Sequence, residues 1–132
     1  MSTDVDQVKA AFASYIAALS SRDIAKIEPP WAHDDSVTRV EPNSEVITVG
    51  WNAVRRNLES FFGGFSEMKI VVADGPYVQV VGDVGWTTSI TPADARTKAG
   101  DALKFRVCTT QVFERRGGVW LVRSNIALPA PQ

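Results

Sequence analysis

The spacing of hydrophobic positions changes along the chain, from a helical period to a strand period. Over residues 4–20, apolar side chains recur every three or four positions, which predicts an amphipathic helix. Its apolar face is made by Val5, Val8, Phe12, Tyr15, Ile16 and Leu19. A short second helix is predicted around Ile24 and Ile27, ending at Pro29-Pro30 because proline lacks the amide donor. A third helix is predicted over 52–62.

Alternating segments predict the strands. The segment 37–42 alternates, and 45–49 is placed to pair back on it. Further strands are predicted, separated by turn sequences, over 68–72, 77–81, 84–91, 103–115 and 119–128. Residues 92–101 read as a long hairpin loop. This order predicts one α+β domain over 1–132, a curved antiparallel sheet wrapped over three helices as a cone with an open mouth.

Composition and charge narrow the function classes. The 132 residues, 45% hydrophobic and 22% charged, are those of an ordinary soluble domain. A net charge of -1 without basic clusters argues against nucleic-acid or anionic-membrane partners. The single Cys108 and single His33 match no metal-site spacing and fit a reducing compartment, so no metal or cofactor is expected. With a polar N-terminus and no apolar run of ~20 residues, we expect a cytoplasmic protein.

Glu41 is the main chemical candidate. It ends the alternating segment 37–42 and is followed by Pro42, eight residues before Gly50-Trp51 opens the third helix. A carboxylate held at such a strand end is a candidate general base, because partial burial raises a carboxyl pKa toward useful values. The alternative interpretation is a solvated residue at a turn.

The layout and three segments resemble the nuclear transport factor 2-like superfamily over nearly the whole chain. The segments are 14–23, 34–54 and 110–120. Two branches are most similar: the SnoaL-like proteins with kinase association domains, and ketosteroid isomerase. Members of the first branch carry two histidines and a serine after the final tryptophan, where this chain has Ser124, Ile126 and Leu128. That departure removes polar groups from the closing strand, so no histidine mechanism is carried over.

The resemblance to ketosteroid isomerase implies a site with a helix tyrosine, an acidic base before a proline and a second acid on a late strand. Tyr15, Glu41 and Gln111 fall at or near these positions, with glutamine replacing the second acid. By this resemblance Glu41 would remove a proton beside a carbonyl, while Tyr15 and Gln111 would donate hydrogen bonds to the oxyanion. Without the resemblance, Tyr15 also fits a core tyrosine and Gln111 an ordinary strand residue.

The ligand-binding residues predicted for such a cone are mostly aromatic: Trp31, Phe61, Trp86 and Phe105. Arg106 interrupts the apolar strand around Phe105, and if it pointed inward it would bind an anionic ligand such as a carboxylate. Three functions stay open. They are a cofactor-free isomerase, cyclase or lyase acting on a small hydrophobic carbonyl compound, a non-catalytic module for a small ligand, and a homodimeric assembly domain.

Overall fold

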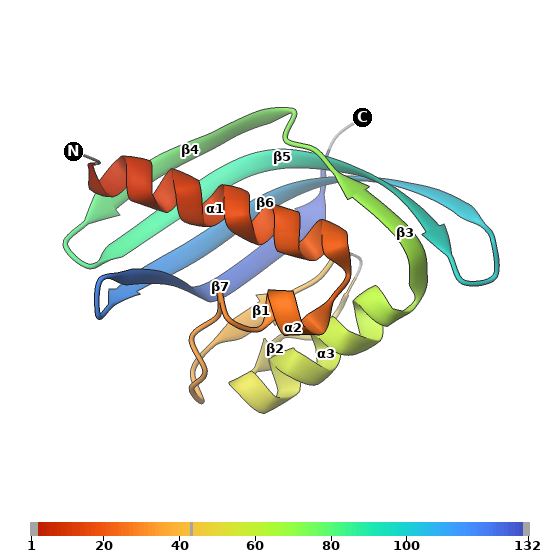
Figure 1. Cartoon of the computed structure of the whole chain (residues 1–132), viewed down its shortest axis with the longest axis horizontal. Coiled ribbons are helices and arrows are strands. Elements are labelled where there is room, and N and C mark those ends of the chain that lie inside the picture. Colours follow the sequence, from red (N-terminus) through yellow and green to blue (C-terminus); the bar gives the residue numbers. More distant parts are fainter. Residues whose placement is uncertain (1–2, 43, 131–132) are drawn as a thin grey trace.

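The computed structural model describes residues 3–42 and 44–130 and has the predicted α+β architecture (Figure 1). Its helices are α1 (Asp4–Ser21), α2 (Ile24–Ile27) and α3 (Trp51–Gly63). Its strands are β1 (Thr38–Val40), β2 (Thr48–Val49), β3 (Phe65–Ile70), β4 (Asp74–Val81), β5 (Val84–Thr97), β6 (Ala102–Arg116) and β7 (Val119–Pro129). They form one sheet in the order β2-β1-β7-β6-β5-β3, with β4 also paired to β5.

The helices cover one face of this curved, unclosed sheet, and α1 passes in front of β5 and β6 at an angle to them (Figure 1). Helix α1 begins at a capping box, in which Thr3 accepts from the amide of Asp6 and the Asp6 carboxylate accepts from the amide of Thr3. The core between helices and sheet is apolar and includes Val8, Phe12, Val54, Leu58, Phe62 and Phe113. The predicted helical face of 4–20 is therefore confirmed at Val8 and Phe12.

Strand β1 joins the two halves of the chain. It pairs antiparallel with β2 and parallel with β7, so that Arg39 lies opposite Asn125. Of the predicted hairpin strand 45–49, only Thr48–Val49 pairs with β1. Gly50 follows with a φ of 88°, a value that favours glycine, and it precedes the first turn of α3.

The predicted loop over 92–101 is wrong over its first six residues, because β5 continues through Pro92 to Thr97 and only residues 98–101 connect it to β6. On its side away from β6, β5 changes partner at this point, from β4 at Ile90 to β3 at Ala93. The carbonyl of Pro92 accepts from Val71 on that side. In an antiparallel sheet, the N–H and C=O groups of one residue point to the same neighbouring strand. The N–H group that Pro92 lacks would therefore point to the gap between β4 and β3, where no ladder hydrogen bond is lost. The strand therefore tolerates proline here.

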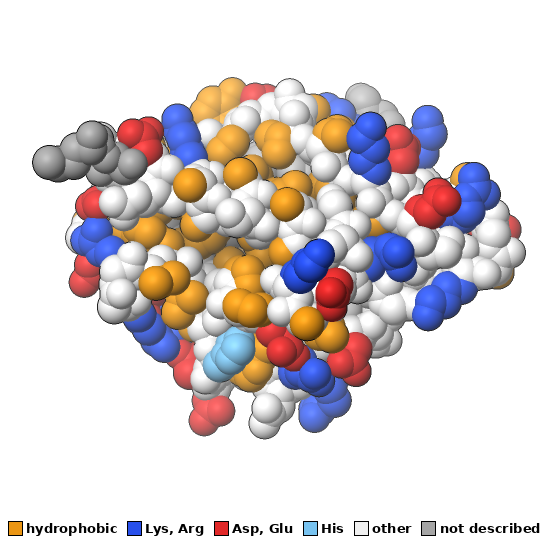
Figure 2. All heavy atoms as spheres, in the orientation of Figure 1, with side chains coloured by type: hydrophobic (Ala, Val, Ile, Leu, Met, Phe, Trp, Pro, Cys, Tyr) orange, Lys and Arg blue, Asp and Glu red, His pale blue; other side chains and the backbone are white. Residues whose placement is uncertain are grey.

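The surface carries both signs of charge. On the face in Figure 2, Lys and Arg side chains are interspersed with Asp and Glu, and the single histidine, in pale blue, is visible. His33 is exposed, as predicted, and stacks on the ring of Trp51 at 4.0 Å. In the described part of the chain, none of the helices is both long and apolar enough to span a bilayer.

Candidate functional site

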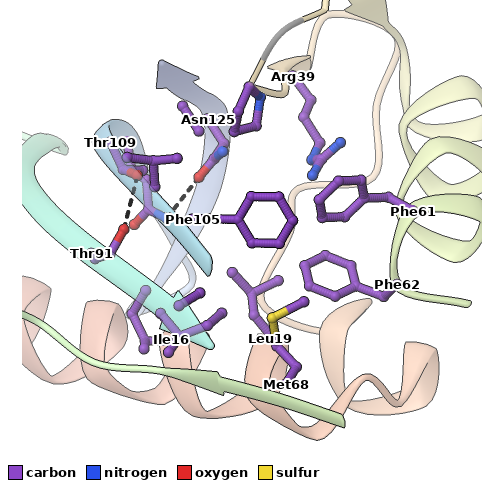
Figure 3. A pocket seen from close by; sticks show the side chains of 16 residues that line it. Ile16, Leu19, Arg39, Phe61, Phe62, Met68, Thr91, Phe105, Thr109 and Asn125 are labelled. Carbon is purple, nitrogen blue, oxygen red and sulfur yellow. Dashed lines mark hydrogen bonds between the residues drawn. The ribbon is translucent and has the colours of Figure 1, made fainter. Parts of the chain in front are cut away.

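A cavity of about 100 Å³ lies between the helices and the inner face of the sheet (Figure 3). Most of its wall is apolar, contributed by Ile16, Leu19, Pro42, Phe61, Phe62, Met68, Ile70, Ala93, Phe105, Val107 and Ala127. Five polar side chains complete it, and these are Arg39, Thr91, Thr109, Gln111 and Asn125. A few polar groups in an apolar wall are the usual composition of a small-molecule site.

Strand register builds the polar part of the cavity. Arg39 on β1 lies opposite Asn125 on β7, and Asn125 lies opposite Gln111 on β6. Residues paired directly across strands direct their side chains to the same face of a sheet. Arg39, Asn125 and Gln111 therefore form one row across three neighbouring strands, on the face that the helices cover.

The polar side chains of the cavity form two hydrogen bonds with one another, one in this row and one beside it (Figure 3). Gln111 donates through Nε2 to Oδ1 of Asn125 at 2.7 Å, and the hydroxyls of Thr91 and Thr109 lie 3.3 Å apart. Gln111 is fully buried, and its Oε1 has no hydrogen-bond partner among the described residues. The amide nitrogen predicted to donate to an oxyanion thus donates to Asn125, and the carbonyl oxygen of Gln111 is left without a partner among the described residues.

Arg39 supplies the positive charge of the cavity wall, and it is not among the residues predicted for the site. Its side chain is 6% exposed, and its guanidinium lies 5.3 Å from the centroid of the Phe61 ring. Both of its side-chain hydrogen bonds, to Glu41 and to Asn57, use Nη1. Its position in the sequence could have indicated this location, because Arg39 lies two residues after the fully buried Val37 and so on the same face of the strand.

Glu41 lies beside the cavity, between Arg39 and Pro42, which both line it. Its Oε2 is 3.3 Å from Nη1 of Arg39, and its Oε1 accepts from Nδ2 of Asn57 at 3.2 Å. The side chain is 23% exposed. The carboxylate therefore lies in a hydrogen-bonded position next to a buried cation. Gln111 lines the adjoining cavity.

Tyr15 and Trp31 belong to the core and do not line the cavity. The Trp31 indole donates to the Tyr15 hydroxyl at 2.8 Å, and their rings meet edge to face at 6.1 Å. The backbone of Trp31 forms a bridge with Val122 of β7. The predicted place of Trp31 in the cavity wall is therefore wrong, because the segment after Pro30 docks on β7 and directs this ring into the core.

Burial, partly offset by the nearby charge of Arg39, raises the pKa of Tyr15 to about 12. A folded-state pKa above the ordinary value of 10.0 favours the protonated phenol, so its stabilisation is complete below pH 10 and is lost as pH rises toward 12. We expect the free energy of unfolding, measured by urea titration, to fall over this interval. In Tyr15→Phe the fall should be smaller, and an unchanged alkaline profile in that variant would contradict the assignment.

Two of the four predicted aromatic wall residues, Phe61 and Phe105, do line the cavity (Figure 3). Trp86 pairs with Val112 and lies on the opposite face from its neighbour Thr87, which is buried on the inner face. Arg106, next to Phe105, is likewise directed to the outer face and is exposed. The predicted places of Trp86 and Arg106 in the cavity wall are therefore wrong.

The closing strand also differs from expectation. Ser124, Ile126 and Leu128 alternate with Asn125 and Ala127, and only the latter two line the cavity. We predicted that the closing strand gives no polar group to the site, because positions 124, 126 and 128 lack the histidines of relatives. This prediction is wrong, since the neighbouring Asn125 places an amide in the cavity wall. Within residues 3–42 and 44–130, we find no group of His, Cys, Asp and Glu side chains that could hold a metal ion.

Comparison with known proteins identifies one matching family and many solved structures with the same fold. The sequence model of the SnoaL-like domain matches residues 8–125. No curated protein matches the chain significantly. A protein from Streptomyces avermitilis, named as a proposed dehydratase of the nuclear transport factor 2-like family, has a TM-score of 0.86 at 21% identity, covering 98% of this chain and 97% of that one.

Two further solved structures are similar. A ketosteroid isomerase-like protein from Erwinia carotovora has a TM-score of 0.82 at 17% identity, with 100% of each chain covered. A protein with a cystatin-like fold from Caulobacter vibrioides has a TM-score of 0.79 at 12% identity, covering 96% of this chain and 89% of that one. At these identities the likeness establishes the fold, and the activity must be argued from the cavity.

Proposed function

This chain belongs to the SnoaL-like domain family of the nuclear transport factor 2-like superfamily, and we propose that its cavity binds a small, largely apolar molecule through a carbonyl oxygen held by Arg39. The observation that carries the proposal is a buried guanidinium lining a mostly apolar wall. Among the described residues, only Nη1 of this group is hydrogen-bonded to other side chains, which leaves Nη2 and Nε for a ligand oxygen.

Charge balance favours a neutral carbonyl over a carboxylate. Glu41 already pairs with Arg39, so the two charges offset each other. A second carboxylate at the same guanidinium would leave one negative charge in a poorly hydrated place, which is costly. A carbonyl oxygen accepts a hydrogen bond from Arg39 without adding charge.

Cavity size limits the ligand further. A volume of about 100 Å³ is well below the ~300–1,000 Å³ of pockets that enclose drug-sized ligands. An apolar cavity of ~150 Å³, larger than this one, holds benzene, so one small ring is the upper limit for a fully enclosed ligand. A compound with a single ring or a short branched chain therefore fits this cavity better than a steroid.

Binding of 4-methylcyclohexanone tests this proposal. We expect the wild-type protein to bind it, and Arg39→Met to weaken binding by roughly tenfold to a hundredfold, because a hydrogen bond to a charged group contributes about 1.5–3 kcal/mol. The measurement is ligand-observed NMR or calorimetry. Arg96→Met is the matched control, since Arg96 is 49% exposed and is not part of this cavity wall. An Arg39→Met variant that binds as well as the wild type would refute the proposal, as would a wild type that does not bind.

Proton transfer is the second candidate function, and the position of Glu41 favours it. Its carboxylate lies beside the cation that would hold the ligand carbonyl. Glu41 would take a proton from the carbon next to that carbonyl, and the electron pair of the broken C–H bond would form an enolate whose oxygen Arg39 stabilises. In a ligand with a C=C bond next to the deprotonated carbon, return of the proton to the far end of the resulting dienolate would complete an isomerisation. Tyr15 has no part in this scheme because it lies outside the cavity wall.

A further inference from the structure

We infer that the ligand of this cavity carries a hydroxyl group in addition to its carbonyl oxygen, and that this hydroxyl forms a hydrogen bond with the side-chain amide of Gln111. The inference rests on the proposed function, since it requires that the cavity bind a small molecule. It names the class of that molecule as a small hydroxycarbonyl compound.

The unpaired amide oxygen of Gln111 is the first observation. This side chain is fully buried and lines the cavity, yet its Oε1 has no hydrogen-bond partner among the described residues. Buried polar atoms in proteins are nearly always paired, because an unpaired one loses its hydration without replacement. A buried acceptor left open beside a cavity is therefore a place for a donor supplied by a ligand.

A hydroxyl fits this place in either orientation of the amide. As described, Nε2 of Gln111 is bonded to Asn125 and Oε1 is open, so the ligand must donate. If the side-chain amides of Gln111 and Asn125 were both flipped, so that oxygen and nitrogen exchanged places, Oε1 would accept from Asn125. The Nε2 group would then face the ligand, and the ligand would have to accept. A hydroxyl can donate and accept, whereas a methyl group or a second carbonyl would not serve both arrangements.

The row across the sheet separates the two polar contacts. Arg39 and Gln111 lie on β1 and β6, with Asn125 of β7 between them. Two steps between neighbouring strands place their backbones roughly 10 Å apart. Apolar side chains, including Phe61 and Phe105, fill most of the remaining wall. A molecule with an apolar body and oxygen atoms at opposite ends matches this distribution.

The test compares 4-hydroxycyclohexanone with 4-methylcyclohexanone, which differ only in hydroxyl against methyl. We expect the hydroxyl compound to bind the wild-type protein about tenfold more tightly, because the hydrogen bond to Gln111 outweighs the lost hydration of the hydroxyl. In Gln111→Met the preference should disappear or reverse. Gln79→Met, the same change at an exposed residue of β4, should keep it.

The outcomes separate this inference from the proposed function. If the methyl compound binds and the hydroxyl compound binds equally or more weakly, the hydroxyl inference is overturned and the carbonyl site stands. A preference that persists in Gln111→Met also overturns it. If neither compound binds the wild type, the proposed function fails and the inference fails with it. The comparison on the wild-type protein needs no variant, so it decides even if Gln111→Met does not fold.

Discussion

Replacing Trp31 with alanine is expected to lower the free energy of unfolding by about 3–5 kcal/mol, the usual cost of removing a large buried ring. Trp31 is 1% exposed, and its ring lies within 6.1 Å of the Tyr15 ring and 6.2 Å of the Trp51 ring, centroid to centroid. The substitution also removes the donor to the Tyr15 hydroxyl, which would stay buried without it. Chemical denaturation followed by tryptophan fluorescence or circular dichroism measures the change.

Trp86→Ala is the matched control for this substitution. Trp86 is partly exposed on the outer face, so its truncation opens no comparable cavity and should cost clearly less. Both variants should be compared at one protein concentration, since association would shift the apparent stability. A loss below about 1 kcal/mol for Trp31→Ala, or an equal loss in the two variants, would show that Trp31 is not a core anchor.

Glu41→Gln is expected to slow proton exchange at the carbons next to the carbonyl of bound 4-methylcyclohexanone by about 10²–10⁴-fold, the usual contribution of a general base. Glutamine cannot take up the proton at neutral pH, yet its side-chain oxygen can still accept from Asn57. Because the substitution removes the charge partner of the buried Arg39, the melting temperature should fall, whereas binding of the ketone should be retained. NMR in deuterated buffer follows the exchange directly.

The control for this experiment is Glu45→Gln, the same change at an exposed residue four positions along the chain. It should exchange the ketone protons as fast as the wild type does. A wild-type rate equal to that in buffer would eliminate the proton-transfer candidate while leaving the binding site intact. Full exchange activity in Glu41→Gln would remove Glu41 from the role of base.

Much of the fold followed from local patterns. The helical spacing of Val8 and Phe12 placed α1, and Gly50, with a φ of 88°, marked the start of α3. The strands β6 and β7 were predicted within one residue at each end. The error at 92–101 arose because Pro92 is a local breaker signal. Its tolerance in β5 depends on a change of partner strand that no local pattern records.

The candidate site was only partly predictable. Phe61, Phe105 and Gln111 were selected, and all three line the cavity. Trp86 and Arg106 were misplaced because one residue along a strand reverses the face of the sheet. Around Trp86 the buried inner face carries the polar residues Thr87 and Ser89, so polarity along the strand does not mark that face. Arg39 escaped selection because a lone arginine in a short strand is usually solvated.

By itself, the sequence determined the order and type of the elements and the superfamily, because helix and strand periods and turn residues are local properties. Tertiary structure decided the chemistry. Parallel pairing of β1 with β7 brings Arg39 beside Asn125 and, one strand further, Gln111, although these residues lie far apart in the chain. Docking of the segment after Pro30 on β7 directs Trp31 into the core. Contacts between distant segments depend on register and docking, which short-range patterns do not encode.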